Sequence, residues 1–260
     1  MLVVLSPAKN MNFDAMDAAP KTTQPRLMDQ VRALSKVTRA LSRADLRAMM
    51  DISEALADLN YERFQSFDPD QPGLKAAALA FNGDVYQGLQ ANTFNGDDFA
   101  FAQDHLRILS GFYGVLRPLE AIQPYRLEMG RKLKTDRGED LYDFWGARIA
   151  ETLNADFGDE PAPTLINLAS NEYFSAVDKK ALKATIITPA FKDVKNGKAR
   201  VLSFYAKWAR GAMARHIVKN RITEPDGLKS FTEGGYRFDE SLSKGSAWVF
   251  TRPQPAKKAA

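Results

Sequence analysis

The segment from Phe101 to Trp145 constrains the fold more than any other, because glycines, prolines and arginines follow one another closely along it. Glycine adopts backbone conformations that other residues avoid, and proline fixes φ. An arginine between such residues is held on a shaped backbone, as in many anion sites. A solvated corner between two helices, with the arginines paired to nearby glutamates, would explain the same pattern. The residues concerned are Gly111, Gly114, Gly130, Pro118, Pro124, Arg117, Arg126 and Glu128.

The composition is that of an ordinary folded protein and excludes several kinds of chemistry. Of the 260 residues, 45% are hydrophobic and 26% are charged, which is enough to build a large core. The absence of cysteine excludes disulfides, thiolate metal sites and a peroxidatic thiol. His105 and His216 are too few for a histidine-rich zinc or iron centre, so we predict no metal site and no cofactor. Carboxylates could still hold Mg²⁺, and the spacing of Asp84, Glu128, Asp143 and Glu172 does not decide the matter.

The chain is expected to form one cytoplasmic domain. No run of residues approaches the ~20 apolar residues of a membrane-spanning helix, and the first residues lack the pattern of a secretory signal. We therefore expect no membrane partner. The length suits a single α/β unit, so we predict one domain over residues 1–251 and a disordered tail over residues 252–260.

Three uninterrupted apolar runs are typical of strands buried on both faces of a sheet. They lie at residues 1–5, 164–168 and 185–188. A fourth strand is expected at 199–203, after a hairpin turn at 196–197. We predict an α/β (mixed α+β) fold in which the runs at 1–5, 164–168 and 199–203 share a mixed sheet with helices outside.

Helices are expected between these strands along the chain and after the last of them. Ser42 is a typical N-cap between two helices within residues 25–58. Asp97 is expected to cap a helix that continues through Leu109. The run at 205–221 predicts a long helix with an apolar face and a basic face.

Positive charge is concentrated between Lys192 and Arg221, where nine lysines or arginines stand against one acid in a chain whose total charge is +4. Such clustering suggests a polyanionic partner, although a solvated basic face is the plainer explanation. The residues predicted to contact DNA or another phosphate, there and in the glycine-rich segment, are Lys9, Arg117, Arg126, Arg131, Lys132, Lys207, Arg210, Arg215 and Lys219.

Polar residues follow several predicted strands, and the carboxyl ends of parallel strands form a common edge where ligands bind. Ser6 and Lys9 match the Ser-x-x-Lys pattern of acyl-enzyme hydrolases, but the companion motifs are absent, so no catalytic residue is predicted. Helix capping is the simpler role for the serines and the asparagine. The predicted pocket-lining residues are Ser6, Asp84, Tyr125, Glu128, Asn167, Ser170, Glu172 and Ser203.

Seven motifs spread over nearly the whole chain point to a known family. They are Leu5-Ser-Pro-Ala-Lys9, Phe81-Asn-Gly-Asp-Val-Tyr86, Leu109-Ser-Gly-Phe-Tyr-Gly-Val-Leu-Arg-Pro-Leu119, Gln123-Pro-Tyr-Arg-Leu-Glu-Met-Gly130, Leu141-Tyr-Asp-Phe-Trp145, Ile166-Asn-Leu-Ala-Ser-Asn-Glu-Tyr-Phe174 and Ser203-Phe-Tyr-Ala-Lys207. In this order they resemble the YaaA family of bacterial peroxide stress resistance proteins. The resemblance implies a cytoplasmic protein that protects against hydrogen peroxide by limiting free iron and oxidative DNA damage, with DNA binding described for the family.

The resemblance also implies a helix-hairpin-helix element, in which amides of a glycine-rich turn contact the DNA backbone at a helix N-terminus. Here the turn would be 110–114, where the glycines are spaced Gly-x-x-Gly and the usual spacing is Gly-x-Gly. The helical pair around Ser42 is an alternative location that lacks the glycines.

The sequence leaves two functions open. The first is a monomeric peroxide stress protein that binds double-stranded or distorted DNA through a basic cleft, largely without sequence specificity, and so protects against iron-dependent oxidative damage. The second is an enzyme that acts on a phosphorylated or nucleotide-like small molecule in the same basic pocket. An open basic groove would favour DNA, and an enclosed pocket around Lys9, Arg126 and Glu128 would favour the enzyme.

Overall fold

The computed structural model describes residues 1–16 and 19–255 and is built around one eight-stranded mixed sheet. The strand order is β11-β12-β9-β8-β1-β5-β6, and β10 pairs with β9 outside this path. Strands from β12 to β5 run parallel to their neighbours, whereas β6, β10 and β11 pair antiparallel. The predicted mixed α/β fold is therefore confirmed. The strands are β1 (Leu2–Leu5), β5 (Leu106–Ser110), β6 (Gly114–Leu116), β8 (Thr164–Asn167), β9 (Thr185–Lys195), β10 (Lys198–Arg200), β11 (Arg237–Phe238) and β12 (Ala247–Pro253).

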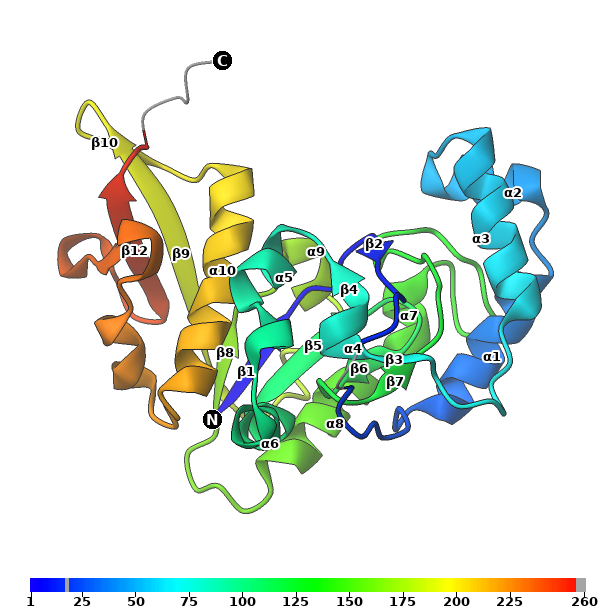
Figure 1. Ribbon diagram of the computed structural model, residues 1–260, viewed down its shortest axis with the longest axis horizontal. Helices are drawn as coiled ribbons and strands as arrows, with labels where there is room; N and C mark the ends of the chain where they lie inside the picture. The colour runs from blue at the N-terminus through cyan, green and yellow to red at the C-terminus, as the bar shows by residue number, and fades with distance from the viewer. Residues whose placement is uncertain (17–18, 256–260) are drawn as a thin grey trace.

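Helices pack around the sheet, and α1 to α3 form an arm that projects at the right of Figure 1. Ser42 caps α2 as predicted, because its hydroxyl accepts a hydrogen bond from the Asp45 amide at 3.2 Å. In the described part of the chain, no helix combines the length and the apolar character needed to cross a bilayer. The α-helices are α1 (Met28–Arg39), α2 (Arg43–Met50), α3 (Glu54–Ser66), α4 (Ala77–Ala80), α5 (Asp84–Leu89), α6 (Gly96–His105), α7 (Leu141–Trp145), α8 (Arg148–Phe157), α9 (Asn171–Phe174) and α10 (Ser203–Lys219).

Shorter elements complete the fold. Two pairs of two-residue strands, β2 with β4 and β3 with β7, lie outside the main sheet. These strands are β2 (Asn10–Met11), β3 (Lys75–Ala76), β4 (Phe81–Asn82) and β7 (Ala121–Ile122), and the 3-10 helices are Ala91–Thr93, Pro225–Ser230, Glu233–Gly235 and Glu240–Leu242.

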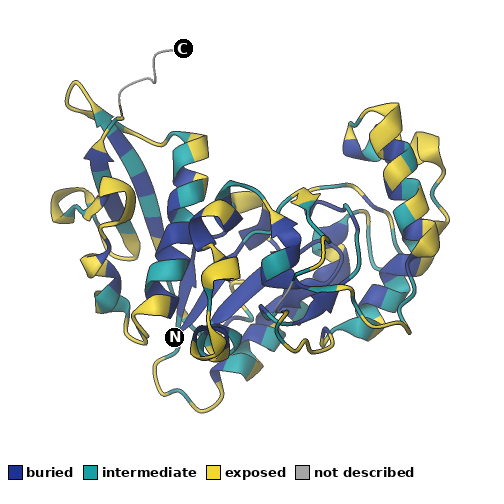
Figure 2. Cartoon of the chain, in the orientation of Figure 1, coloured by how far each residue is buried: buried dark blue, intermediate teal, exposed yellow. Residues whose placement is uncertain are grey.

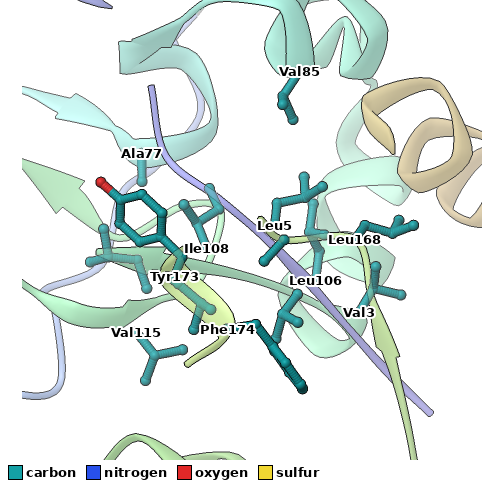
Figure 3. Close-up of a cluster of buried hydrophobic side chains, with 14 of the residues drawn as sticks. Val3, Leu5, Ala77, Val85, Leu106, Ile108, Val115, Leu168, Tyr173 and Phe174 are labelled. Atoms are coloured by element: carbon teal, nitrogen blue, oxygen red, sulfur yellow. The ribbon is translucent and has the colours of Figure 1, made fainter. Parts of the chain in front are cut away.

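Strand β1 lies in the interior of the sheet, between β5 and β8. All four of its residues are buried, and the dark strands at the centre of Figure 2 show the same burial. Apolar side chains from these strands pack with Leu168 and Phe174 in the core shown in Figure 3. The prediction that the runs at 1–5 and 164–168 share a sheet is confirmed, and the two strands are direct neighbours in it.

The predicted buried strand at 199–203 is wrong. Only Lys198–Arg200 forms a strand, which is partly exposed and pairs with β9 alone, and Ser203 already begins α10. The hairpin turn itself is confirmed, since Asn196 and Gly197 have φ values of 50° and 71° in the left-handed region that this turn requires. β10 pairs only with the last three residues of β9, 193–195, and two of its own three residues are exposed.

The predicted helix through Leu109 is also wrong, because α6 ends at His105 and the chain continues as β5. The side chain of Asn95, and not of Asp97, caps this helix. β5 pairs with β6 with Ser110 opposite Gly114, so the turn at 110–114 joins two strands. This turn is therefore a β-hairpin and not the expected helix-hairpin-helix element. A pair of helices does lie around Ser42.

The sheet includes part of the expected C-terminal tail. β12 continues to Pro253, and the side chain of Arg252 is 9% exposed and binds Asp193 with an Nε–Oδ1 distance of 2.7 Å. Residues 252 and 253 are thus ordered, because this ion pair and seven parallel positions hold β12 against β9. The last part of the expected tail, 256–260, lies outside the described residues.

Helices α5 and α10 approach each other so closely that glycine is required on both. A Cβ atom on Gly88 would lie 2.1 Å from the Trp208 carbonyl oxygen. A Cβ atom on Gly211 would lie 1.7 Å from the Val85 carbonyl oxygen. These contacts fix α10 against the segment that follows β4, and no side chain can be inserted without separating the helices.

We predict that Gly211→Ala destabilises the protein by about 3 kcal/mol or more, since an added methyl group overlaps a backbone carbonyl. Gly96→Ala is the matched control, because nothing lies within 4 Å of a Cβ atom there. Urea unfolding of both variants measures the difference. Equal stability of the two variants would contradict this close packing.

Candidate functional site

The chain leaves the carboxyl end of β1 through a segment that is fixed to β8 and α5. The amide of Ser170 donates to the Ser6 hydroxyl at 2.8 Å, and the two hydroxyls lie 3.3 Å apart. The hydroxyl of Tyr86 donates to the Ser6 carbonyl at 3.1 Å. Ser6 and Ser170 are therefore brought together as the sequence predicted, because they follow neighbouring parallel strands.

Three cations converge on the buried carboxylate of Glu128. The distances to its Oε1 atom are 3.1 Å from Arg126, 3.5 Å from Lys9 and 3.6 Å from Arg131. Arg63 on α3 lies near this group, since burial and then the positive charge of Arg126 lower the pKa of Arg63. We call Lys9, Arg63, Arg126, Glu128 and Arg131 the Glu128 cluster. One carboxylate cannot neutralise four cations, so the cluster attracts anions.

The glycine-rich segment holds this cluster in place, as its sequence suggested. The amide of Gly130 donates to Glu172 Oε1 at 3.0 Å. A Cβ atom on Gly111 would lie 2.3 Å from the Leu127 carbonyl oxygen, so the two backbones can touch only at glycine. The buried hydroxyl of Tyr125 lies 2.6 Å from Ser110 Oγ. Tyr125 and Glu172 therefore fix the backbone on either side of Glu128 by these hydrogen bonds.

Two atoms of the Glu128 cluster keep hydrogen-bonding capacity. Oε2 of Glu128 and Nε of Arg126 are buried and have no hydrogen-bond partner in the described part of the chain. A buried polar atom without a partner costs roughly 1–3 kcal/mol. By contrast, the side chain of Lys9 is 59% exposed and that of Arg131 is 27% exposed. The cluster thus combines accessible cations with buried groups able to bind a polar ligand.

Arg117 lies elsewhere and does not join this cluster. Its NH2 atom lies 2.7 Å from Asp156 Oδ1, and the same carboxylate binds Arg26 and Arg107. Together with Met1, these residues mark the amino end of β1, where Arg107, Arg117 and Asp156 line a cavity of about 300 Å³. The sequence could not show that Arg117 and Arg126 lie apart. Between them the chain makes a turn and forms β7, and the two side chains end near opposite ends of β1.

The basic face of α10 is largely occupied by contacts within the protein. Arg215 donates to Thr93 Oγ1 at 2.6 Å, and Lys219 and Arg221 bind the carboxylate of Asp98. Burial lowers the pKa of Arg210. Lys207 is exposed and forms no ion pair within the described residues. Phosphate binding by Arg215 or Lys219 would have to break these contacts.

The remaining predicted site residues are dispersed. Asn167 accepts a hydrogen bond from the Ala169 amide at 3.0 Å, the local role that its sequence context also allowed. Lys132 is exposed, and Asp84 and Ser203 lie in the first turns of α5 and α10. Within the described residues, no group of three histidine or carboxylate side chains is arranged to hold a metal ion.

Sequence reasoning missed Arg63. It lies on α3, a helix that the sequence analysis did not separate from α2, and it follows no motif. Arg63 can be identified only from the three-dimensional structure. Arg131 donates a hydrogen bond to the Met49 carbonyl of α2 at 3.4 Å, and α2 packs against α3, which carries Arg63.

Asp156 supplies a prediction for stability against pH. Burial alone would raise the pKa of Asp156, but hydrogen bonds and charges from Arg107, Arg117 and Arg26 outweigh burial and lower it to about 2. A depressed carboxyl pKa stabilises the fold above the unfolded pKa of about 4, and the contribution disappears as pH falls through the folded value.

We therefore expect Asp156→Asn to lower the free energy of unfolding by about 2–3 kcal/mol at pH 7, with the deficit shrinking between pH 4 and pH 2. Asp29→Asn is the control, since the Asp29 side chain is 94% exposed. Denaturant titrations at pH 7, 4 and 3 measure the difference. A deficit that is the same at all three pH values would refute this role of the carboxylate.

Comparisons with known proteins identify the family. Residues 1–242 match the family described as peroxide stress protein YaaA. The chain is 58% identical to a UPF0246 protein of Maricaulis maris over the full length of both chains. It is 56% identical to a UPF0246 protein of Caulobacter vibrioides and 50% identical to one of Saccharophagus degradans, in each case over 98% of this chain and all of the relative. With its core motifs on β1, β5 and the Glu128 cluster, this chain belongs to the YaaA family of peroxide stress proteins.

Proposed function

We propose that this peroxide stress protein acts in the cytoplasm as a monomer that binds DNA without sequence specificity through the Glu128 cluster. The observation that carries the proposal is the convergence of Lys9, Arg126 and Arg131 on one carboxylate, with Arg63 beside them. The excess positive charge is held on a rigid backbone and is partly open to solvent. Contacts of this kind bind phosphates and carry no information about base sequence.

The division of roles within the cluster favours a polymer backbone as ligand. Lys9 and Arg131 are the accessible cations, and they can meet phosphates at the surface. The Arg126 side chain is only 13% exposed, so it raises the local potential and orients Glu128 without leaving the protein. A phosphodiester chain needs only surface contacts of this type to be bound.

Phosphate binding also suggests how DNA would be protected. A protein that neutralises phosphates releases the cations condensed on the DNA. Ferrous ions are among the cations that such binding displaces, and a peroxide that meets no iron at the DNA generates no radical there. This mechanism needs no redox group in the protein, which agrees with a chain that has no cysteine.

A second candidate function rests on the buried Oε2 atom of Glu128. The Ser6–Ser170 pair follows the carboxyl ends of the adjacent parallel strands β1 and β8, where α/β enzymes bind small ligands. Glu128 is linked to this edge through Lys9, whose Nζ lies 3.5 Å from Glu128 Oε1. An enzyme acting on a phosphorylated or nucleotide-like small molecule would use Glu128 as a proton acceptor and the cations to hold the phosphate.

We predict that the double variant Lys9→Ala, Arg131→Ala weakens binding of every duplex tested to a similar extent. The plot of log Kobs against log[salt] should lose about 2 units of slope, since each phosphate contact on B-DNA contributes about 0.9. Both substitutions leave the Arg126–Glu128 ion pair intact. Titration of a labelled duplex at several salt concentrations measures the slope.

The matched control is Arg237→Ala, Lys244→Ala, which removes the same charge from two exposed residues near β11. A control that lowers the slope equally would assign the effect to net charge and contradict the proposed site. Unchanged duplex binding in the cluster variant, together with lost binding of nucleotides, would favour the enzyme.

A further inference from the structure

The basic run from Lys192 to Arg221 divides into two parts in the structure. Its C-terminal part is engaged within the protein, because Lys219 and Arg221 bind the carboxylate of Asp98 and Arg215 donates to Thr93 Oγ1. The N-terminal part has no such partners within the described residues. Its cations are Lys192, Lys195, Lys198, Arg200, Lys207 and Arg210.

The one acid in this run cannot neutralise the N-terminal part. Asp193 is 2% exposed, and its two oxygens bind Arg252 at 2.7 Å and the Tyr236 hydroxyl at 3.1 Å. The rings of Tyr205 and Tyr236 lie 4.6 Å and 4.4 Å from the Arg252 guanidinium. Asp193 is therefore fully engaged by Arg252 and Tyr236. The exposed cations of this part, Lys195, Lys198, Arg200 and Lys207, form no ion pair within the described residues.

These cations lie on a projecting hairpin. β9 and β10 meet at the turn of Asn196 and Gly197, and Lys195, Lys198 and Arg200 line a cavity of about 330 Å³ beneath it. In Figure 1 the hairpin projects at the left edge of the protein, whereas the α1–α3 arm stands at the right. The hairpin surface is thus distinct from the Glu128 cluster, which includes Arg63 of that arm.

Two large apolar side chains are exposed beside the hairpin. Val201 is 54% exposed and Phe204, at the second position of α10, is 60% exposed. A single exposed apolar residue is ordinary, but here an aromatic ring lies between Arg200 and Lys207 in the sequence. Alternation of cations with an exposed ring is the pattern of surfaces that bind unpaired nucleotides, whose bases stack on the ring while phosphates meet the cations.

We propose that the β9–β10 hairpin and the start of α10 form a second nucleic-acid site, which binds single-stranded DNA by stacking a base on Phe204 and holding phosphates with Lys195, Lys198 and Arg200. The inference deepens the proposed function by naming unpaired strands as a ligand, but it uses a different surface. Duplex DNA keeps its base faces inside the stack, so the ring selects unpaired bases.

The test is fluorescence anisotropy with a labelled 15-nucleotide oligothymidine and a labelled duplex. Phe204→Ala should weaken oligothymidine binding about 5- to 100-fold, the range for loss of one base–aromatic contact, and leave duplex binding unchanged. Phe204→Trp should retain binding because the ring is kept. Leu74→Ala is the control for loss of an exposed apolar side chain, since Leu74 is 69% exposed and lies elsewhere.

The charge contribution has its own matched pair. Lys198→Ala, Arg200→Ala should weaken oligothymidine binding and reduce its salt slope by about 1.4, at about 0.7 per phosphate for single strands. Lys21→Ala, Lys36→Ala removes the same charge from exposed residues outside the hairpin and should change neither. Equal effects of the two pairs would overturn the proposal.

The two DNA sites can fail separately. Loss of duplex binding only in Lys9→Ala, Arg131→Ala and loss of oligothymidine binding only in Phe204→Ala supports both. Oligothymidine binding that depends on Phe204, without any duplex binding, would sink the proposed function and leave this inference standing. Oligothymidine binding that is unaffected by Phe204→Ala overturns the inference, as does Phe204-dependent binding to phosphatidylserine vesicles without binding to oligothymidine.

Discussion

The parallel pairing of β1 with β5 and β8 is the contact on which the rest of the structure depends. A four-residue strand buried on both faces must have every backbone group paired and every side chain packed, which only an interior position in a sheet provides. Once β1 is fixed, Ser6 and Lys9 emerge at its carboxyl end and the Asp156 ion pairs lie at its amino end. The two ends of the strand thereby separate Arg117 from Arg126, which are only nine residues apart in the sequence.

The role of each basic residue depends on its contacts more than on the total number of basic residues. Arg107, Arg215 and Lys219 are basic residues that tie strands and helices together. Arg107 and Lys219 bind carboxylates, and Arg215 donates to the Thr93 hydroxyl. The Glu128 cluster and the β9–β10 hairpin keep positive charge that the protein does not neutralise. A paired cation ties parts of the protein together, whereas an unpaired cation creates a positive electrostatic potential that attracts an anionic ligand. The net charge of +4 conceals this division.

The sequence predicted those elements whose pattern is local. The apolar runs of β1 and β8, the left-handed turn at 196–197 and the cap at Ser42 each depend on a few adjacent residues. β5 was missed because Arg107 interrupts its apolar run. The carboxylate that lets this arginine be buried belongs to Asp156, 49 residues away, so the sequence near β5 does not reveal it. Similarly, nothing near Arg117 in sequence reveals that its partner is Asp156, 39 residues away.

Some of the residues predicted for the site lie together in the structure, and their binding of a ligand stays a prediction. Four predicted residues do converge, namely Lys9, Arg126, Glu128 and Arg131. The glycines of the central segment allow the close backbone contacts that bring them together, and glycines can be recognised in the sequence. Arg63 was not predicted, because an isolated arginine on a helix carries no signal until α3 is placed beside the cluster.

The two unneutralised surfaces have different physical characters. The Glu128 cluster is anchored by a buried carboxylate and tight backbone contacts, so its cations hold fixed positions. The β9–β10 hairpin is paired on one side only, and its cations surround an exposed ring. Fixed cations suit the regular spacing of phosphates on a duplex, whereas an exposed ring is useful only to bases that have left the stack. Under the two proposals, a DNA that engages both surfaces combines paired and unpaired segments.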